Sequence, residues 1–147
     1  MYYFAYGSNM DICQTKCRVG NFKIIGKATL NGFALKFNKK SVDGSGKANI
    51  EIAKNSIVEG VVFELTEDKF ELLDCFEKGY HRSKPINTLI DGKVTEVVTY
   101  LADSNRINNN LLPTVCYLNI IIEAAEMIGL SNSYQKNLKS FRAKKDR

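Results

Sequence analysis

The sequence predicts an α+β fold, in which a curled sheet or small barrel is flanked by helices. Short apolar or alternating segments, typical of strands, occupy most of the first hundred residues. The dipeptides Asn31-Gly32 and Asp91-Gly92 each separate two such segments and favour tight hairpins. Helical periodicity is found in mid-chain and again toward the C-terminus. Hairpin-connected strands with few helices are typical of α+β domains.

Length and composition are those of one globular domain covering residues 1–147. The chain has 44% hydrophobic and 25% charged residues, enough to bury an ordinary core. It contains no internal repeat and no proline-rich linker, because Pro85 and Pro113 are its two prolines and lie far apart. We therefore expect a single continuous domain.

The first half of the chain is expected to begin with a strand and a short helix, followed by β structure. Asn31-Gly32 is interpreted as a hairpin turn, and the polar stretch 41–47 as a flexible loop. The expected elements are a strand at 2–6, a helix within 9–17, and strands at 22–30, 33–39, 48–53 and 58–65.

The second half begins with a helix over 66–79, which Thr66 can cap and Gly79 ends. Its apolar face would contain Phe70, Leu73 and Phe76, with Glu77 nearby. The segments 83–90 and 94–102 flank Asp91-Gly92 as a second hairpin, and two helices follow. The first runs from Pro113 to Gly129, and Ser131 can cap the second.

The net charge of +5 resides in a basic C-terminal tail from about Lys136, so the body of the chain is neutral. Such a tail could bind nucleic acid or an acidic lipid surface. We favour a solvated helix end, because no aromatic stacking platform accompanies the charge, and we expect no nucleic-acid partner.

Membrane and metal sites are also not expected. The most apolar run, 115–128, is interrupted by polar residues, and no secretory signal precedes the domain, so a cytoplasmic location is predicted. The four cysteines lack CxxC spacing, which favours reduced thiols. A zinc site at Cys13, Cys17 and His81 would lack a fourth ligand.

The segment YGSN, which ends the first strand, is the first candidate for a functional site. Where a strand gives way to a helix, backbone N–H groups lack partners, and small residues let an anionic or carbonyl oxygen approach them. The Ser8 hydroxyl and Asn9 amide would add hydrogen bonds. The alternative is an ordinary tight turn at Gly7 with Ser8 or Asn9 as a helix cap.

The segment LLDCFEKGYHR is the second candidate, because Glu77 lies near an apolar helix face. A carboxylate desolvated there has a raised pKa and can serve as a base at neutral pH. The alternative is an exposed glutamate or one paired with Arg82. With His81 as the single histidine, a serine or cysteine triad is not expected.

Taken together, YFAYGSNM, EGVVFELT, LLDCFEKGYHR and VVTYLA resemble the γ-glutamylcyclotransferases, including their AIG2-like members, in order and spacing. The resemblance extends from Tyr2 to about Phe141. It implies a six-stranded, barrel-like α+β fold and an enzyme that cyclises γ-glutamyl amino acids or amines to 5-oxoproline, without metal or cofactor. A non-catalytic member that binds a small molecule or a partner protein is the alternative, and a monomer or homodimer is expected.

The resemblance also implies roles for individual residues. Glu77 matches the catalytic acid/base, and the substrate's own α-amine would be the nucleophile. Here Lys78 precedes Gly79 and Tyr80 follows directly, whereas many relatives have extra residues at this point, so the choice of leaving group is open. The residues that match the substrate-binding positions are Tyr3, Phe4, Ala5, Tyr6, Gly7, Ser8, Asn9, Tyr100 and Ala102.

Overall fold

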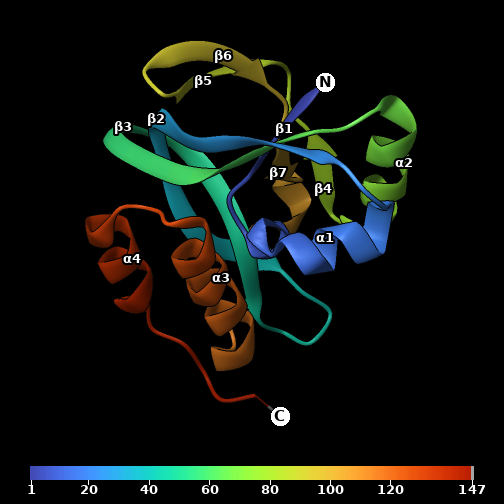
Figure 1. Cartoon of the computed structure of the whole chain (residues 1–147). Coiled ribbons are helices and arrows are strands. Elements are labelled where there is room, and N and C mark those ends of the chain that lie inside the picture. Colours follow the sequence, from blue (N-terminus) through green and yellow to red (C-terminus); the bar gives the residue numbers. More distant parts are fainter. Residues whose placement is uncertain (147) are drawn as a thin grey trace.

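Two long antiparallel strands, β2 (Lys23–Lys40) and β3 (Gly46–Glu64), form the centre of the computed structural model, which describes residues 1–146 (Figure 1). Strand β1 (Tyr2–Ala5) pairs with β3, while β5 (Ile86–Ile90) joins β2 to β6 (Lys93–Val97). All pairs are antiparallel, and the order is β1-β3-β2-β5-β6. A separate two-stranded sheet contains β4 (Tyr80–Arg82) and β7 (Tyr100–Ala102).

The α+β class is confirmed, but the closed six-stranded barrel is wrong. Among the described residues, β1 and β6 are the edges of an open five-stranded sheet. The two edges approach each other through one parallel bridge between Tyr3 and Val98, with Phe4 N–H donating to the Val98 carbonyl at 2.9 Å. Pairing stops there because the chain enters β7 at Tyr100 and joins β4 in the second sheet.

The predicted hairpin at Asn31-Gly32 is also wrong, because β2 runs through this dipeptide and pairs with β3 on both sides of it. A two-residue type I′ turn needs positive φ at both positions. Gly32 has φ +83°, but Asn31 is not among the residues with positive φ. The pair instead marks a register shift where both strands bend, and the hairpin turn lies at 41–45.

The hairpin at Asp91-Gly92 is confirmed. Asp91 has φ +50° and Gly92 has φ +75°, as a type I′ turn requires. The turn joins β5 to β6, whose registered pairs run from Ile86 with Val97 to Ile90 with Lys93.

Four α-helices lie around the sheet in two contacting pairs, α1 with α2 and α3 with α4 (Figure 1). Side chains at three N-caps accept a backbone N–H: Asp11 for α1, Thr114 for α3 and, as predicted, Ser131 for α4. The helices are α1 (Ile12–Val19), α2 (Glu67–Phe76), α3 (Val115–Ile128) and α4 (Asn132–Lys139), with 3₁₀ turns at Ser8–Met10 (η1) and Ser104–Arg106 (η2).

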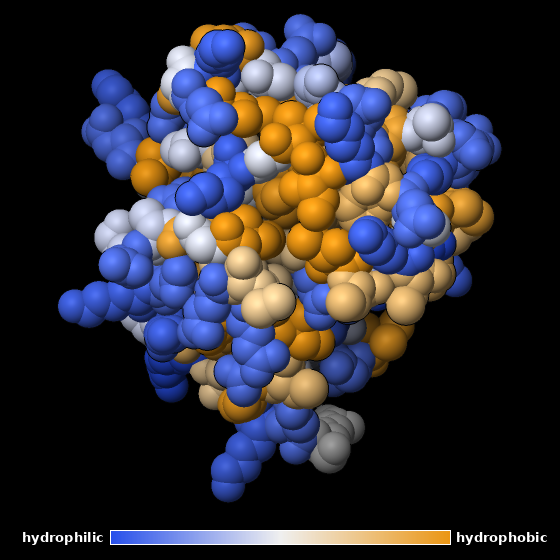
Figure 2. Space-filling model, viewed as in Figure 1, coloured by the Kyte–Doolittle hydropathy of each residue, from blue (hydrophilic) through white to orange (hydrophobic). Residues whose placement is uncertain are grey.

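The core lies between the sheet and these helices, with Phe4, Phe63, Phe70 and Ile121 fully buried. On the face drawn in Figure 2, apolar side chains gather toward the centre, and hydrophilic side chains surround them. Within residues 1–146, no helix combines the length and apolar character needed to span a bilayer.

The basic C-terminal segment folds back onto the domain. Its first residues belong to α4, and the chain then returns to the start of α3, where Val115 N–H donates to the Lys144 carbonyl at 2.9 Å. The Phe141 ring packs edge-on against Phe37, with centroids 4.9 Å apart. As far as Lys144, the segment is therefore anchored by these two contacts and is not a frayed end.

Candidate active site

The YGSN segment forms a tight connection between β1 and α1. After β1 ends at Ala5, the chain passes through Gly7 into the 3₁₀ turn at Ser8–Met10. Within residues 1–146, the backbone N–H groups of Gly7 and Ser8 donate to no protein acceptor. A Cβ at Gly7 would lie 3.2 Å from the Ala48 methyl group, so glycine lets the turn pack closely against Ala48.

Glu77 lies just beyond α2, which ends at Phe76, three residues before the predicted end at Gly79. Gly79 has φ +85°, and the turn around it leads directly into β4. Because the helix stops early, Phe76 is half-exposed, while the Glu77 carboxylate turns toward the YGSN segment.

Asn9 joins the two candidate segments. Its Nδ2 donates to Glu77 Oε1 at 2.5 Å and to the Tyr3 hydroxyl at 3.0 Å. Its Oδ1 accepts from Arg18 Nη1 at 3.0 Å and from Gln14 Nε2 at 3.4 Å. Because Arg18 and Gln14 both donate to its oxygen, the Asn9 amide is oriented with its nitrogen toward the Glu77 carboxylate.

A small cavity of about 30 Å³ lies between these groups. Seven predicted site residues line it, whereas Phe4, Ala5 and Ala102 are buried beside it and do not. The lining residues are Tyr3, Tyr6, Gly7, Ser8, Asn9, Ala48, Glu77, Tyr80, Tyr100 and Tyr117.

Ala48, Tyr80 and Tyr117 were missed by the sequence analysis. Ala48 and Tyr117 come from β3 and α3, which local patterns do not connect to the two candidate segments, whereas Tyr80 lies within the second segment itself, at the start of β4. One signal was available, since Tyr117 places a hydroxyl in the otherwise apolar first turn of α3.

Hydrogen bonds to the backbone hold the tyrosine side chains in place around the cavity. The Tyr80 hydroxyl donates to the Ala48 carbonyl at 2.7 Å, and the Tyr117 hydroxyl accepts from the Ala48 N–H at 3.0 Å. The Tyr6 hydroxyl donates to the Tyr100 carbonyl at 2.6 Å. Burial raises the pKa of all five tyrosines that line the cavity, so they are neutral hydrogen-bonding groups and not bases.

Glu77 is the titratable carboxylate of the cavity. Burial raises its pKa above the ordinary value, against the opposing effects of the Asn9 hydrogen bond and the nearby cations Arg18 and Lys39. A carboxylate with a raised pKa can accept and return a proton near neutral pH.

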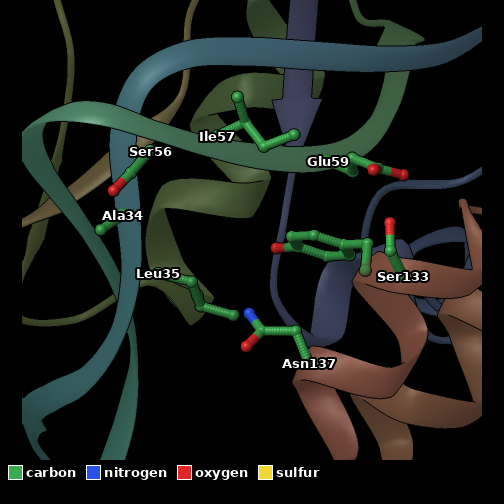
Figure 3. A pocket seen from close by; sticks show the side chains of 8 residues that line it. Ala34, Leu35, Ser56, Ile57, Glu59, Ser133 and Asn137 are labelled. Carbon is green, nitrogen blue, oxygen red and sulfur yellow. The ribbon is translucent and has the colours of Figure 1, made fainter.

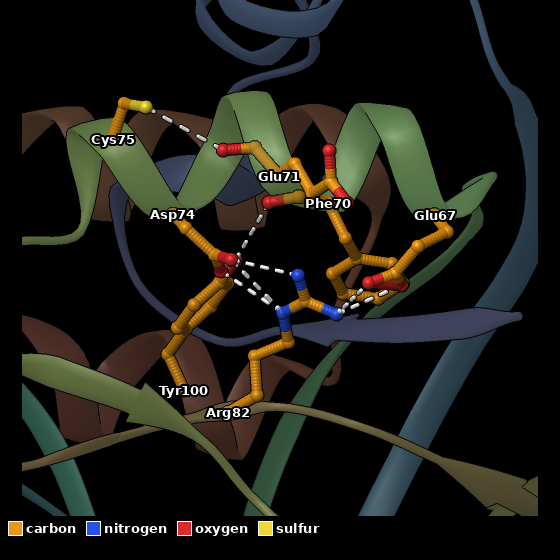
Figure 4. A network of polar contacts seen from close by, with 7 residues as sticks. All are labelled: Glu67, Phe70, Glu71, Asp74, Cys75, Arg82 and Tyr100. Carbon is orange, nitrogen blue, oxygen red and sulfur yellow. Dashed lines mark hydrogen bonds and ion pairs between the residues drawn. The ribbon is translucent and has the colours of Figure 1, made fainter.

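The alternative in which Glu77 pairs with Arg82 does not hold, because Arg82 pairs with two other carboxylates (Figure 4). Its Nη2 lies 2.7 Å from Asp74 Oδ2, and its Nη1 lies 2.8 Å from Glu67 Oε1. Asp74 also accepts the Tyr100 hydroxyl at 2.6 Å. The Arg82 hydrogen bonds lower the pKa of Asp74, so two carboxylates three residues apart are shifted in opposite directions.

The cysteines lie outside this cavity. All four are exposed, unpaired thiols, and the His81 ring lies 2.8 Å from the Asp103 carboxylate. Within residues 1–146, no group of three or more His, Cys, Asp and Glu side chains is placed to hold a metal ion.

A second, wider cavity lies between α4 and the bend of β2 and β3 (Figure 3). The buried Tyr134 hydroxyl in its lining has no hydrogen-bond partner among the described residues. Its carboxylate, Glu59, is already bonded to the Ser131 hydroxyl at 2.5 Å. Glu77, in contrast, is a buried carboxylate with a raised pKa and lies beside backbone N–H groups without a protein acceptor among the described residues.

Comparison with known families gives a match over most of the chain. A family model described as "Gamma-glutamyl cyclotransferase, AIG2-like" matches residues 3–118. This span includes every residue that lines the Glu77 cavity. Among curated protein sequences, none matches the chain significantly.

Solved structures share the fold. A structure named gamma-glutamyl cyclotransferase has 26% sequence identity and a TM-score of 0.87, over 97% of this chain and 88% of its own. An uncharacterized human protein, also 26% identical, has a TM-score of 0.86 over 99% and 90% of the two chains. A yeast γ-glutamyl cyclotransferase specific to glutathione, 13% identical over 94% and 93%, has a TM-score of 0.68 and shows a likeness of fold alone.

Proposed function

Because the chain belongs to the gamma-glutamyl cyclotransferase, AIG2-like family, we propose that it cyclises γ-glutamyl amino acids or γ-glutamyl amines to 5-oxoproline and releases the amine. The observation that carries this proposal is the contact between Glu77 and Asn9 in a small cavity beside backbone donors that have no protein acceptor among the described residues. The cavity brings a base and carbonyl-binding N–H groups to one place, as an intramolecular acyl transfer requires.

In the proposed reaction, the α-amine of the substrate attacks its own γ-carbonyl carbon. Glu77 removes a proton from the α-ammonium, which makes the nitrogen nucleophilic. The new C–N bond closes the five-membered ring, the ring nitrogen gives up its second proton to solvent, and the original amide C–N bond breaks. Glu77 then returns the proton to the departing nitrogen, so the enzyme ends in its starting state.

Two further contributions come from the cavity walls. Holding the chain of the substrate folded back on itself supplies proximity, which can remove about 7–11 kcal/mol from a barrier. The Gly7 and Ser8 N–H groups would donate to the oxygen on which negative charge develops. The neutral tyrosines exclude water from the reacting atoms without competing for the proton.

The test is release of 5-oxoproline from γ-glutamyl dipeptides, γ-glutamyl amines and glutathione. Wild type is compared with Glu77→Gln and with the matched control Glu71→Gln, an exposed glutamate on α2. We expect Glu77→Gln to lose roughly 10²- to 10⁴-fold in kcat and the control to lose nothing.

Full activity of a folded Glu77→Gln variant would refute the assigned role. If the wild type releases 5-oxoproline from none of these compounds, the proposed reaction is refuted, and a non-catalytic binding member of the same fold is favoured. Calorimetric titration with γ-glutamyl compounds would then test that role.

A further inference from the structure

A wider cleft opens directly outside the Glu77 cavity. It has a volume of about 430 Å³ and shares four lining residues with the inner cavity: Ser8, Glu77, Tyr80 and Tyr117. If the γ-glutamyl part of a substrate fills the inner cavity, the part beyond the scissile amide extends into this cleft. The side chains of the cleft therefore meet the leaving group.

The cleft is strongly basic. Four cations line it, and Glu77 is the one acidic residue in the lining. Two of the cations, Lys39 and Lys47, lie directly opposite each other across β2 and β3. Like charges in this position destabilise an antiparallel pair, so the strands carry an unfavourable contact. The four cations are Arg18, Lys39, Lys47 and Lys78.

Lys39 is the most confined of these cations. Its side chain lies over the Glu77 turn, because a Cβ at Gly79 would be 2.7 Å from Lys39 Cε. The residue is 8% exposed, and its ammonium makes no ion pair or hydrogen bond with any of residues 1–146. The ammonium contacts instead the face of the Tyr80 ring, 4.9 Å from the centroid. Glu77 is nearby but not in direct contact, and a confined cation without a direct ion-pair partner is costly.

Carboxylates near the cleft are already engaged. Asp103 lies 2.8 Å from the His81 ring, and Asp43 accepts from the Ser45 hydroxyl at 2.5 Å within the 41–45 turn. Lys47 lies over the Tyr117 ring, 4.0 Å from its centroid, and likewise has no ion pair among the described residues. Among the described residues, no carboxylate therefore forms a direct ion pair with Lys39 or Lys47, and a ligand carboxylate could do so.

We infer that the cleft selects leaving groups carrying extra negative charge, so that the preferred substrates are γ-glutamyl dipeptides ending in glutamate or aspartate. This inference rests on the proposed function. A side-chain carboxylate on the leaving residue would supply the counter-ion that Lys39 and Lys47 lack. A leaving group with a net positive charge would be repelled, and an uncharged amine would leave the lysines unpaired.

The test compares γ-glutamyl-glutamate with γ-glutamyl-glutamine, which match in size and differ in one charge. We expect kcat/KM to favour the acidic dipeptide by about 10-fold at low salt, and the preference to shrink as salt rises. γ-Glutamyl dipeptides ending in lysine should be poorer than both.

Lys39→Met and Lys47→Met, which keep most of the apolar stem, should reduce the preference toward equality. The control Lys93→Met removes an exposed lysine from the β5–β6 hairpin and should leave the preference unchanged. Because Lys39 also acts on Glu77, the readout is the ratio between the two dipeptides, in which any effect on the base cancels.

The outcomes separate this inference from the reaction itself. Equal turnover of the two dipeptides by wild type would overturn the inference and leave the cyclotransferase proposal intact. A preference that survives both methionine variants would also overturn the inference, since another group would then select the charge. Lack of turnover of every dipeptide would instead refute the reaction.

Discussion

Replacing Asn9 with alanine should detach Glu77 from the YGSN segment. Asn9 is 4% exposed, and its Nδ2 donates the 2.5 Å hydrogen bond to the Glu77 carboxylate. That bond lowers the pKa of Glu77 against the effect of burial. Without it, the pKa rises further, and a larger fraction of Glu77 is protonated at neutral pH and unable to act as a base.

A hydrogen bond to a charged group is worth about 1.5–3 kcal/mol. Loss of that stabilisation corresponds to a decrease of about 10- to 100-fold in kcat/KM at neutral pH. The assay is 5-oxoproline release between pH 5 and 9. The acidic limb of the kcat/KM profile should move to higher pH, so part of the lost activity should return in alkaline buffer.

A structural role alone would lower activity at every pH and leave the shape of the profile unchanged. An unshifted acidic limb in a folded Asn9→Ala variant would therefore refute the positioning of Glu77 by Asn9. The matched control is Asn87→Ala, which removes an exposed asparagine from β5 and should behave as wild type. Thermal melting of both variants shows whether either has lost its fold.

Three further predictions concern stability. Burial raises the folded-state pKa of Glu77 above its ordinary 4.5, so the ionised group costs stability at neutral pH. Glu77→Gln should melt at a higher temperature than wild type at pH 7. This difference in melting temperature should disappear as the pH falls below about 4.5. An equal difference at pH 4 and pH 7 would contradict the prediction. Gly60→Ala places a Cβ 2.3 Å from the Ala5 carbonyl oxygen and should lower the free energy of unfolding by about 1–3 kcal/mol, measured by denaturant unfolding. An unchanged denaturation midpoint would show that β1 and β3 can move apart without loss of stability. Ser131→Ala removes the cap of α4 and should cost about 1 kcal/mol with no change in turnover, so a loss of activity would argue against a purely local role.

The fold was predictable where a local signal had one structural solution. Asp91-Gly92 formed its hairpin because both residues adopt positive φ and the flanking strands are short. The same rule wrongly predicted a hairpin turn at Asn31-Gly32, because the long β2–β3 pairing at this point depends on residues far along the chain. The prediction of a closed barrel was wrong for a similar reason, because closure depends on which sheet the residues after Val98 join.

The site was predictable as two segments but not as a cavity. Successive residues of a strand point to opposite faces, so a motif in β1 includes positions on both. Tyr3 reaches the cavity and Phe4 does not, although both match the same motif. Tyr117 contributes from a helix more than a hundred residues later, and no spacing rule connects it with Gly7.

The scattered origin of the cavity walls has a consequence for how the protein opens. Its lining comes from β1, the YGSN segment with η1, β3, β4, β7, α3 and the turn after α2, so no single supersecondary unit contains it. Hydrogen exchange normally divides a domain into units that unfold separately. A ligand in this cavity contacts several such units at once and should slow amide exchange in all of them together. Exchange protection from a bound γ-glutamyl compound should therefore extend from Tyr3 to Tyr117 and not stop at the residues in direct contact.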